Sequence, residues 1–166
     1  MKRTIVSVVI MFSLAGCATY YTAPENSPTS VIDFVTDMRP VIVYRFENSQ
    51  CESSKQGDRL AYIDPVYHPE FKYRGPVRVE AGRELVFTMY KSSTTGLGTL
   101  LEWDTCNATI RFTPKIGQKY QATFTRANGP DCSVQLFKVL TDNAGGQRLV
   151  PEETAIANER ICKSKQ

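Results

Sequence analysis

From residue 31 onward, the chain contains short apolar or alternating stretches separated by polar segments rich in Gly, Pro, Asn and Asp. The clearest example is the pair of stretches 77–80 and 85–90 on either side of Ala81-Gly82. In both halves large apolar residues occupy every second position, which is the period of a half-buried strand. These residues are Val77, Val79, Leu85, Phe87 and Met89. The pattern predicts a β-hairpin.

Further segments have the β-branched and aromatic content, or the alternation, that is typical of strands. They are residues 41–46, 59–63, 99–103, 108–112, 119–125, 132–140 and 148–150. The segment 132–140 is expected to be well buried. Residues 31–38, which end before Pro40, fit either a short helix or a lead-in strand. Residues 91–98 read as a flexible loop, and 151–162 as a short helix with Pro151 in its first position.

About eight or nine short strands, with no convincing amphipathic helix before residue 151, predict an all-β fold. Such regular spacing favours an antiparallel β-sandwich, and a small β-barrel is the alternative.

The first residues have the composition of an export signal. Lys2 and Arg3 precede an apolar run that ends at Leu14 and is too short to span a bilayer. The run closes with the residues LAGC, which resemble the lipobox of bacterial lipoproteins. In that family the cysteine is diacylated on sulfur, released by a signal peptidase and acylated on its new amine. The resemblance implies a signal peptide over 1–16 and a lipid anchor on Cys17. The alternative is ordinary secretion with cleavage after Ala18.

The polar, proline-containing segment 17–30 is expected to be a lipidated tether, followed by a single β-sandwich domain over 31–166. Tyr20 and Tyr21 either rest at the lipid interface or are simple linker residues. Ala18 and Thr19 follow Cys17 where an aspartate would resemble an inner-membrane retention signal. We therefore expect the periplasmic face of the outer membrane.

The remaining four cysteines are an even number, which suits disulfides in an oxidising compartment. Three pairings are possible, and we predict Cys106–Cys132 and Cys51–Cys162. The first pair sits at the starts of two neighbouring predicted strands, and the second would hold down the C-terminal tail. A zinc site is disfavoured because there is no C-x-x-C spacing and only one histidine.

Charge adds little to the picture. Once Lys2 and Arg3 leave with the signal peptide, 18 basic residues face 17 acidic ones. A net charge near +1 gives no support to nucleic acid as a partner.

The mature chain also resembles small uncharacterised envelope lipoproteins with immunoglobulin-like domains. The similarity lies in a V-x-V-x-A-G stretch, a cysteine before F-x-P-x-x-G-x-x-Y, and a second cysteine before a terminal strand. It implies a fold and no active site, since each position has a role in packing, turns or a disulfide. The matching residues are Val77, Val79, Ala81, Gly82, Cys106, Phe112, Pro114, Gly117, Tyr120 and Cys132.

Candidate chemistry is sparse. His68 and Glu70 could share a metal, and Glu102 and Asp104 would fall on one strand face beside Trp103 as a glycosidase-like pair. A solvated histidine and an exposed acidic strand are the simpler interpretations. No cofactor and no metal site is predicted.

The better candidate is the loop 62–74, in which aromatic side chains concentrate among prolines and basic residues, as in many binding hot spots. The same side chains could instead plug one end of the sandwich. Its candidate residues are Tyr62, Tyr67, His68, Phe71, Tyr73 and Arg74. The expected function is a non-catalytic binding or scaffolding module for an envelope protein or glycan. An inhibitor or ligand-binding lipoprotein is the alternative, and a glycoside-type hydrolase a distant third.

Overall fold

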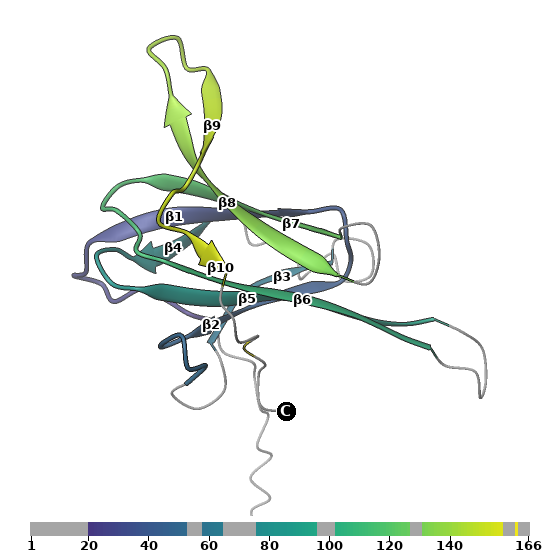
Figure 1. Ribbon diagram of the computed structural model, residues 1–166. Helices are drawn as coiled ribbons and strands as arrows, with labels where there is room; N and C mark the ends of the chain where they lie inside the picture. The colour runs from purple at the N-terminus through teal and green to yellow at the C-terminus, as the bar shows by residue number, and fades with distance from the viewer. Residues whose placement is uncertain are drawn as a thin grey trace, which may run out of the picture.

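The computed structural model describes residues 20–52, 58–64, 76–95, 102–126, 131–157 and 162. Within these residues the chain forms two five-stranded sheets that stack face to face (Figure 1). The first sheet has the order β4 (Val77–Glu80), β1 (Thr29–Thr36), β7 (Lys119–Arg126), β8 (Cys132–Thr141), β9 (Gln147–Pro151). The second has the order β10 (Ile156–Ala157), β6 (Glu102–Phe112), β5 (Leu85–Thr95), β2 (Val41–Phe46), β3 (Asp58–Ile63).

The all-β sandwich with two disulfides is confirmed, and the small barrel is not what forms, since the two sheets remain separate. Antiparallel pairs dominate, but β1 pairs in parallel with β7, from Val31 with Lys119 to Thr36 with Phe124. For the segment 31–38 the strand alternative is correct. No described segment forms a helix long and apolar enough to cross a membrane.

The core lies between the sheets and is built by alternate residues of each strand. Ile32 and Phe34 of β1 are 0 % and 2 % exposed, while the alternate residues Val31, Asp33 and Val35 face outward. Phe34 meets Phe87 edge to face at 5.5 Å between ring centroids. Phe112 meets Tyr120 in the same way at 5.0 Å. Each such fully buried side chain contributes roughly 1.5–3 kcal/mol to folding.

Turn residues hold the sheets in register at one end of the sandwich. Gly82, with φ +84°, donates its N–H to the Pro114 carbonyl at 2.8 Å. The buried Tyr120 hydroxyl accepts the Lys115 backbone N–H at 3.0 Å, in the manner of the tyrosine corner of β-sandwiches. Glycine suits the positive φ because it has no Cβ.

The predicted disulfides both form. Cys106–Cys132 joins β6 to β8 across the sandwich with a Cα–Cα distance of 5.8 Å. Cys51–Cys162 covers the outer face of the second sheet, where Cys162 donates its N–H to the Thr109 hydroxyl at 3.0 Å. The argument from strand starts was wrong for Cys106, which lies in the middle of β6 and reaches Cys132 because the sheets are stacked.

Four local predictions were wrong. The β-hairpin expected around Ala81-Gly82 does not form, because β4 pairs with β1 in the first sheet whereas β5 pairs with β2 and β6 in the second. Residues 91–95 continue β5 instead of forming a loop, and residues 102–103 and 108–112, which were predicted in two separate strands, belong to one strand, β6. Pairing from Lys91 with Cys106 to Thr95 with Glu102 extends this ribbon beyond the sandwich (Figure 1). The helix expected from Pro151 does not form, because Pro151 ends β9 and a turn leads into β10.

Candidate functional site

The predicted binding loop lies mostly outside the described residues, as do Cys17, His68 and Glu70. Its described member, Tyr62, lies on β3, and its hydroxyl donates to the Asp64 carboxylate at 3.3 Å. Burial raises the pKa of Tyr62, and the nearby Asp64 raises it further. Tyr67, His68, Phe71, Tyr73 and Arg74 stay predictions.

The predicted carboxylate pair lies at the distal end of β6. Glu102 and Asp104 are paired through their backbones with Thr95 and Ser93 of β5, and their side chains fall outside the description. Among the described residues, no three His, Cys, Asp or Glu side chains gather where they could hold a metal ion.

The most prominent exposed feature is the hairpin of β8 and β9, which stands out from the body of the sandwich (Figure 1). Its turn is held by Asp142, whose Oδ1 accepts the backbone N–H groups of Ala144 and Gly146 at 2.9 and 2.7 Å. Asp142 N–H also donates to the Gly146 carbonyl at 2.9 Å, and Gly145 has φ +82°. The tip therefore has a defined conformation.

The outer face of this hairpin is apolar. In β8 the even-numbered residues turn toward the second sheet, as buried Leu136 and disulfide-bonded Cys132 show, so the odd-numbered residues face outward. The register places Phe137 opposite Pro151 and Val139 opposite Leu149 on that outer side. Leu149 is 44 % exposed and Pro151 is exposed as well, whereas Phe137 and Val139 are half-buried. We call Phe137, Val139, Leu149 and Pro151 the hairpin patch.

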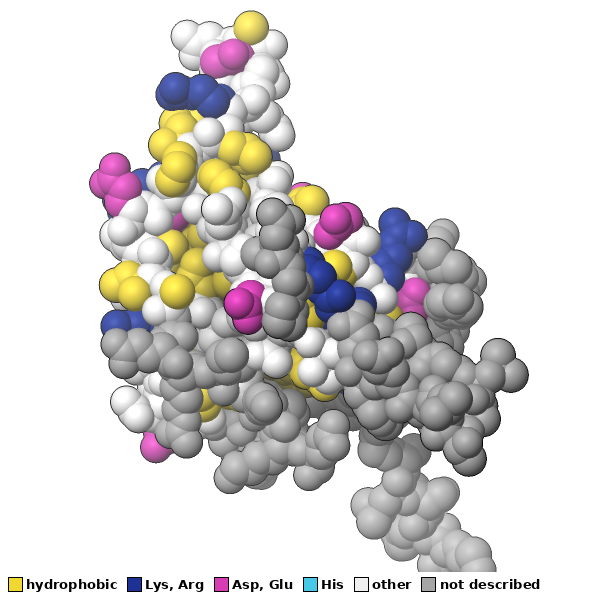
Figure 2. Space-filling model, turned by 45° about the vertical axis from the view of Figure 1, so that its right-hand side comes forward, with side chains coloured by type: hydrophobic (Ala, Val, Ile, Leu, Met, Phe, Trp, Pro, Cys, Tyr) yellow, Lys and Arg dark blue, Asp and Glu magenta, His cyan; other side chains and the backbone are white. Residues whose placement is uncertain are grey.

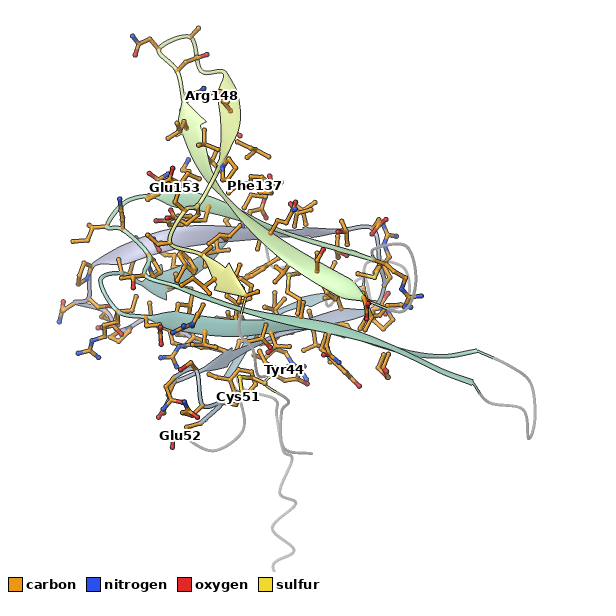
Figure 3. The ribbon with its side chains drawn as sticks, in the orientation of Figure 1. Tyr44, Cys51, Glu52, Phe137, Arg148 and Glu153 are labelled. Carbon is orange, nitrogen blue, oxygen red and sulfur yellow. A yellow bond between two sulfur atoms is a disulfide. The ribbon has the colours of Figure 1, made fainter. Side chains whose placement is uncertain are left out.

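Hydrophobic side chains line this hairpin in the space-filling view, with charged side chains among them toward the tip (Figure 2). Phe137 lies near the base of the hairpin and Arg148 toward its tip (Figure 3). Leu140, on the opposite face, is 37 % exposed. Within 132–140 only Leu136 is buried, so the prediction that this segment is well buried was wrong, and its second half extends beyond the sandwich.

A buried ion pair anchors the base of the hairpin. The Glu152 side chain is 1 % exposed, and its Oε2 lies 3.3 Å from Lys138 Nζ. Its Oε1 accepts the Thr154 N–H at 3.0 Å and the Thr154 hydroxyl at 2.8 Å. Burial raises the pKa of Glu152, but these hydrogen bonds and Lys138 outweigh it, so the pKa falls below the ordinary value.

Two hollows accompany these features. A groove of about 280 Å³ lies between β8, β6 and residues 151–157, with Ile110, Val134 and Ala155 in its lining. A charged cleft of about 420 Å³ lies on the other side of the molecule, lined by Tyr21, Arg45, Glu47, Glu80, Arg83, Glu84 and Leu85.

The charges in that cleft are largely compensated at short range. Arg83 Nε lies 3.4 Å from Glu80 Oε1, and Arg111 Nη1 lies 3.3 Å from Glu84 Oε1. The Arg45 guanidinium stacks over the Tyr21 ring at 4.7 Å. The cleft therefore presents both signs of charge, which suits a polar ligand that itself carries both.

Sequence reasoning predicted the strands of the hairpin and missed the patch on it. The available signal was the turn sequence DNAGG between two apolar segments, which indicates a hairpin. Pattern alone did not show that its outer face stays uncovered.

Compared with protein-family models, with curated proteins and with solved structures, the chain has no match.

Proposed function

We propose that this protein is a lipid-anchored, non-catalytic binding module of the bacterial outer membrane that faces the periplasm. It holds an envelope protein by the hairpin patch. The export leader and the LAGC residues support the anchor. Stacked, disulfide-joined sheets support the role of a rigid scaffold.

The observation that carries the proposal is the apolar outer face of a hairpin that projects from the sandwich. Large apolar side chains gathered at one exposed place are typical of protein interaction sites. The apolar character favours a protein partner over a glycan, because sugars need polar groups as well as ring faces.

The geometry favours the face of the hairpin over its free edge. Glu152 N–H donates to the Leu136 carbonyl, so even-numbered residues of β9 direct their backbone groups toward β8. Gln147, Leu149 and Pro151 therefore direct theirs to the free edge. Pro151 has no N–H to offer there, which disfavours the addition of another strand.

A photo-reactive amino acid placed at Leu149 or at Arg148 in intact cells tests this function. The two positions are neighbours on opposite faces of one exposed strand. We expect a specific protein adduct from position 149 and none from 148. Leu149→Asp should abolish recovery of that partner, and Arg148→Asp should leave it unchanged. Equal adducts from both positions, or no adduct at 149, would refute the proposal.

The anchor has its own test. Cys17→Ala should abolish incorporation of a radioactive fatty acid and release the protein from the outer-membrane fraction. Labelling that persists in this variant would contradict lipidation at Cys17.

A second candidate function is capture of a small ligand, and the charged cleft favours it. A short peptide with free amino and carboxyl ends is the probe that matches its mixed charge. Titration of alanyl-alanine followed by NMR should shift the amides of Arg45 and Glu47 if the cleft binds it. No shift up to millimolar peptide would remove this candidate.

A further inference from the structure

The N-terminal end of the described chain is part of the folded domain. Tyr20 forms a parallel β-bridge with Arg59 of β3, and Tyr21 N–H donates to the Arg59 carbonyl at 2.9 Å. The Tyr21 side chain packs against the core. The Arg59 guanidinium lies over the rings of Tyr20 and Tyr62, at 5.8 and 6.0 Å from their centroids. Part of the segment expected to be a free tether is therefore held against β3.

The same segment continues along the neighbouring edge of the first sheet. Thr22 and Ala23 line a hollow together with Pro76, Val77 and Arg78 at the β4 edge. The chain from Tyr20 to Ala23 thus closes the side of the sandwich where β3 and β4 lie. We call this side the seam.

Chain length then places the seam close to the membrane. Three residue steps separate Cys17 from Tyr20. A fully extended chain spans at most about 3.3–3.6 Å per residue, so Tyr20 lies within about 11 Å of an acylated Cys17. The polar headgroup layer on each side of a bilayer is roughly 5–8 Å thick. This step rests on the lipid anchor of the proposed function.

We propose that the seam, with Tyr20, Arg59 and Tyr62, lies on the phospholipid headgroups of the membrane that holds the anchor. Tyrosine rings are enriched at membrane–water interfaces because they have an apolar body and a polar tip. A guanidinium binds phosphate through several N–H donors. Tyr20 and Tyr62 suit the membrane interface, and Arg59 between them suits a lipid phosphate.

This orientation directs the hairpin patch away from the lipid. β3 and β4 are the first strands at one side of the sandwich, and β9 and β10 are the last strands at the other. Four strand spacings of about 4.8 Å separate β4 from β9, so β9 lies roughly 19 Å farther from the membrane than β4. The domain would then be held close to the membrane, with the hairpin patch facing the periplasm.

The test uses the lipidated protein in vesicles of phosphatidylethanolamine and phosphatidylglycerol. A photo-reactive residue at Thr22, exposed on the seam, should form lipid adducts, and one at Asn143, exposed at the hairpin tip, should form none. Equal lipid adducts at both positions would overturn the orientation. Mass spectrometry of the N-terminal peptide in the same samples reports acylation. A protein without acyl chains contradicts the anchor, and an acylated protein with equal adducts contradicts only the seam.

A longer linker distinguishes two causes of lipid contact, the short distance to the anchor and the affinity of the seam itself for headgroups. A flexible insertion of roughly ten glycine and serine residues between Thr19 and Tyr20 adds about 17 Å of root-mean-square reach. If the seam binds headgroups, the Thr22 adduct should persist in this variant and fall when Arg59→Gln and Tyr20→Ser are added. If the insertion alone removes the adduct, the seam has no affinity for lipid and the proposed contact is wrong.

Discussion

Replacing Glu152 by glutamine tests how the base of the hairpin is held. The substitution keeps an Oε1 acceptor for Thr154 but removes the charge that faces Lys138 at 3.3 Å. Loss of one partner of a fully buried pair costs about 3–5 kcal/mol. Here the Lys138 side chain is 23 % exposed and stays partly hydrated, so we expect about 1–3 kcal/mol. For a domain of this size, each kcal/mol corresponds to a fall in Tm of roughly 2–4 °C.

The effect should depend on pH in a defined direction. The folded pKa of Glu152 lies below its ordinary value of 4.5, because hydrogen bonds from Thr154 and the Lys138 charge outweigh the cost of burial. Its stabilisation is therefore complete above the unfolded pKa and disappears as the pH falls through the folded pKa. The difference in unfolding free energy between the native protein and Glu152→Gln should be largest near neutral pH and vanish in acid.

Urea unfolding over a pH series measures this difference. Glu153→Gln is the matched control, since it makes the same chemical change at the next residue, which is exposed. The control should change the stability by less than about 0.5 kcal/mol. The reasoning would be refuted by a Glu152→Gln variant as stable as the control at neutral pH, or by a difference that does not change with pH.

Three further variants test interactions that stabilise the sandwich. Tyr120 is 1 % exposed, and Tyr120→Phe removes the hydroxyl that accepts a backbone N–H, so it should lower the unfolding free energy by about 1–3 kcal/mol. Tyr44→Phe changes a half-buried ring and should cost clearly less. Equal losses would contradict the role of the Tyr120 hydroxyl in the tyrosine corner. Gly82→Ala meets open space but forces a side chain to adopt φ +84°, so it should cost about 1–2 kcal/mol, and an unchanged urea midpoint would show that no strain exists there. Removing Cys106 and Cys132 together should cost about 3.5 kcal/mol in the chain-entropy model, given their separation of 26 residues, and free thiols at both positions in non-reducing peptide maps of the native protein would disprove the pairing.

Several elements were predictable because their signals are local. Strands β4 and β5 follow from alternation on both sides of Ala81-Gly82, and Gly82 takes the positive φ that the turn requires, but their pairing as a hairpin was wrong because they join different sheets. The parity of the cysteines indicated two bridges, and both predicted pairs form.

Other elements depend on partners that a local pattern does not contain. Residues 91–95, KSSTT, have the composition of a loop, yet they are strand because each pairs with a residue of β6. β1 takes the strand alternative because β4 and β7 offer it backbone partners on both sides. Pro151 suits the start of a helix, but at the outer edge of β9 its missing N–H costs nothing.

The candidate functional residues were also predictable only in part. Sequence reasoning pointed to the aromatic loop 62–74 because composition is visible in a sequence. The hairpin patch was missed because a sequence does not show exposure: Leu149 has the character of a core residue, yet it is 44 % exposed where the sheet extends beyond its partner. For Tyr20 and Tyr21 the sequence suggested a lipid interface as one alternative, but their packing against β3 and the core was missed, since they lie in a segment whose composition is that of a tether.

Local signals were enough to predict the all-β class, the two bridges and the main turns, and they gave the expectation of an export leader and lipid anchor. These depend on periodicity, residue chemistry and short motifs, which involve neighbours within a few residues. The folded structure was needed to show which strands are neighbours, where the sheet extends into solvent, and which side of the sandwich the N-terminal segment packs against. Those outcomes depend on backbone pairing and burial between residues far apart in the chain, and no local pattern encodes them.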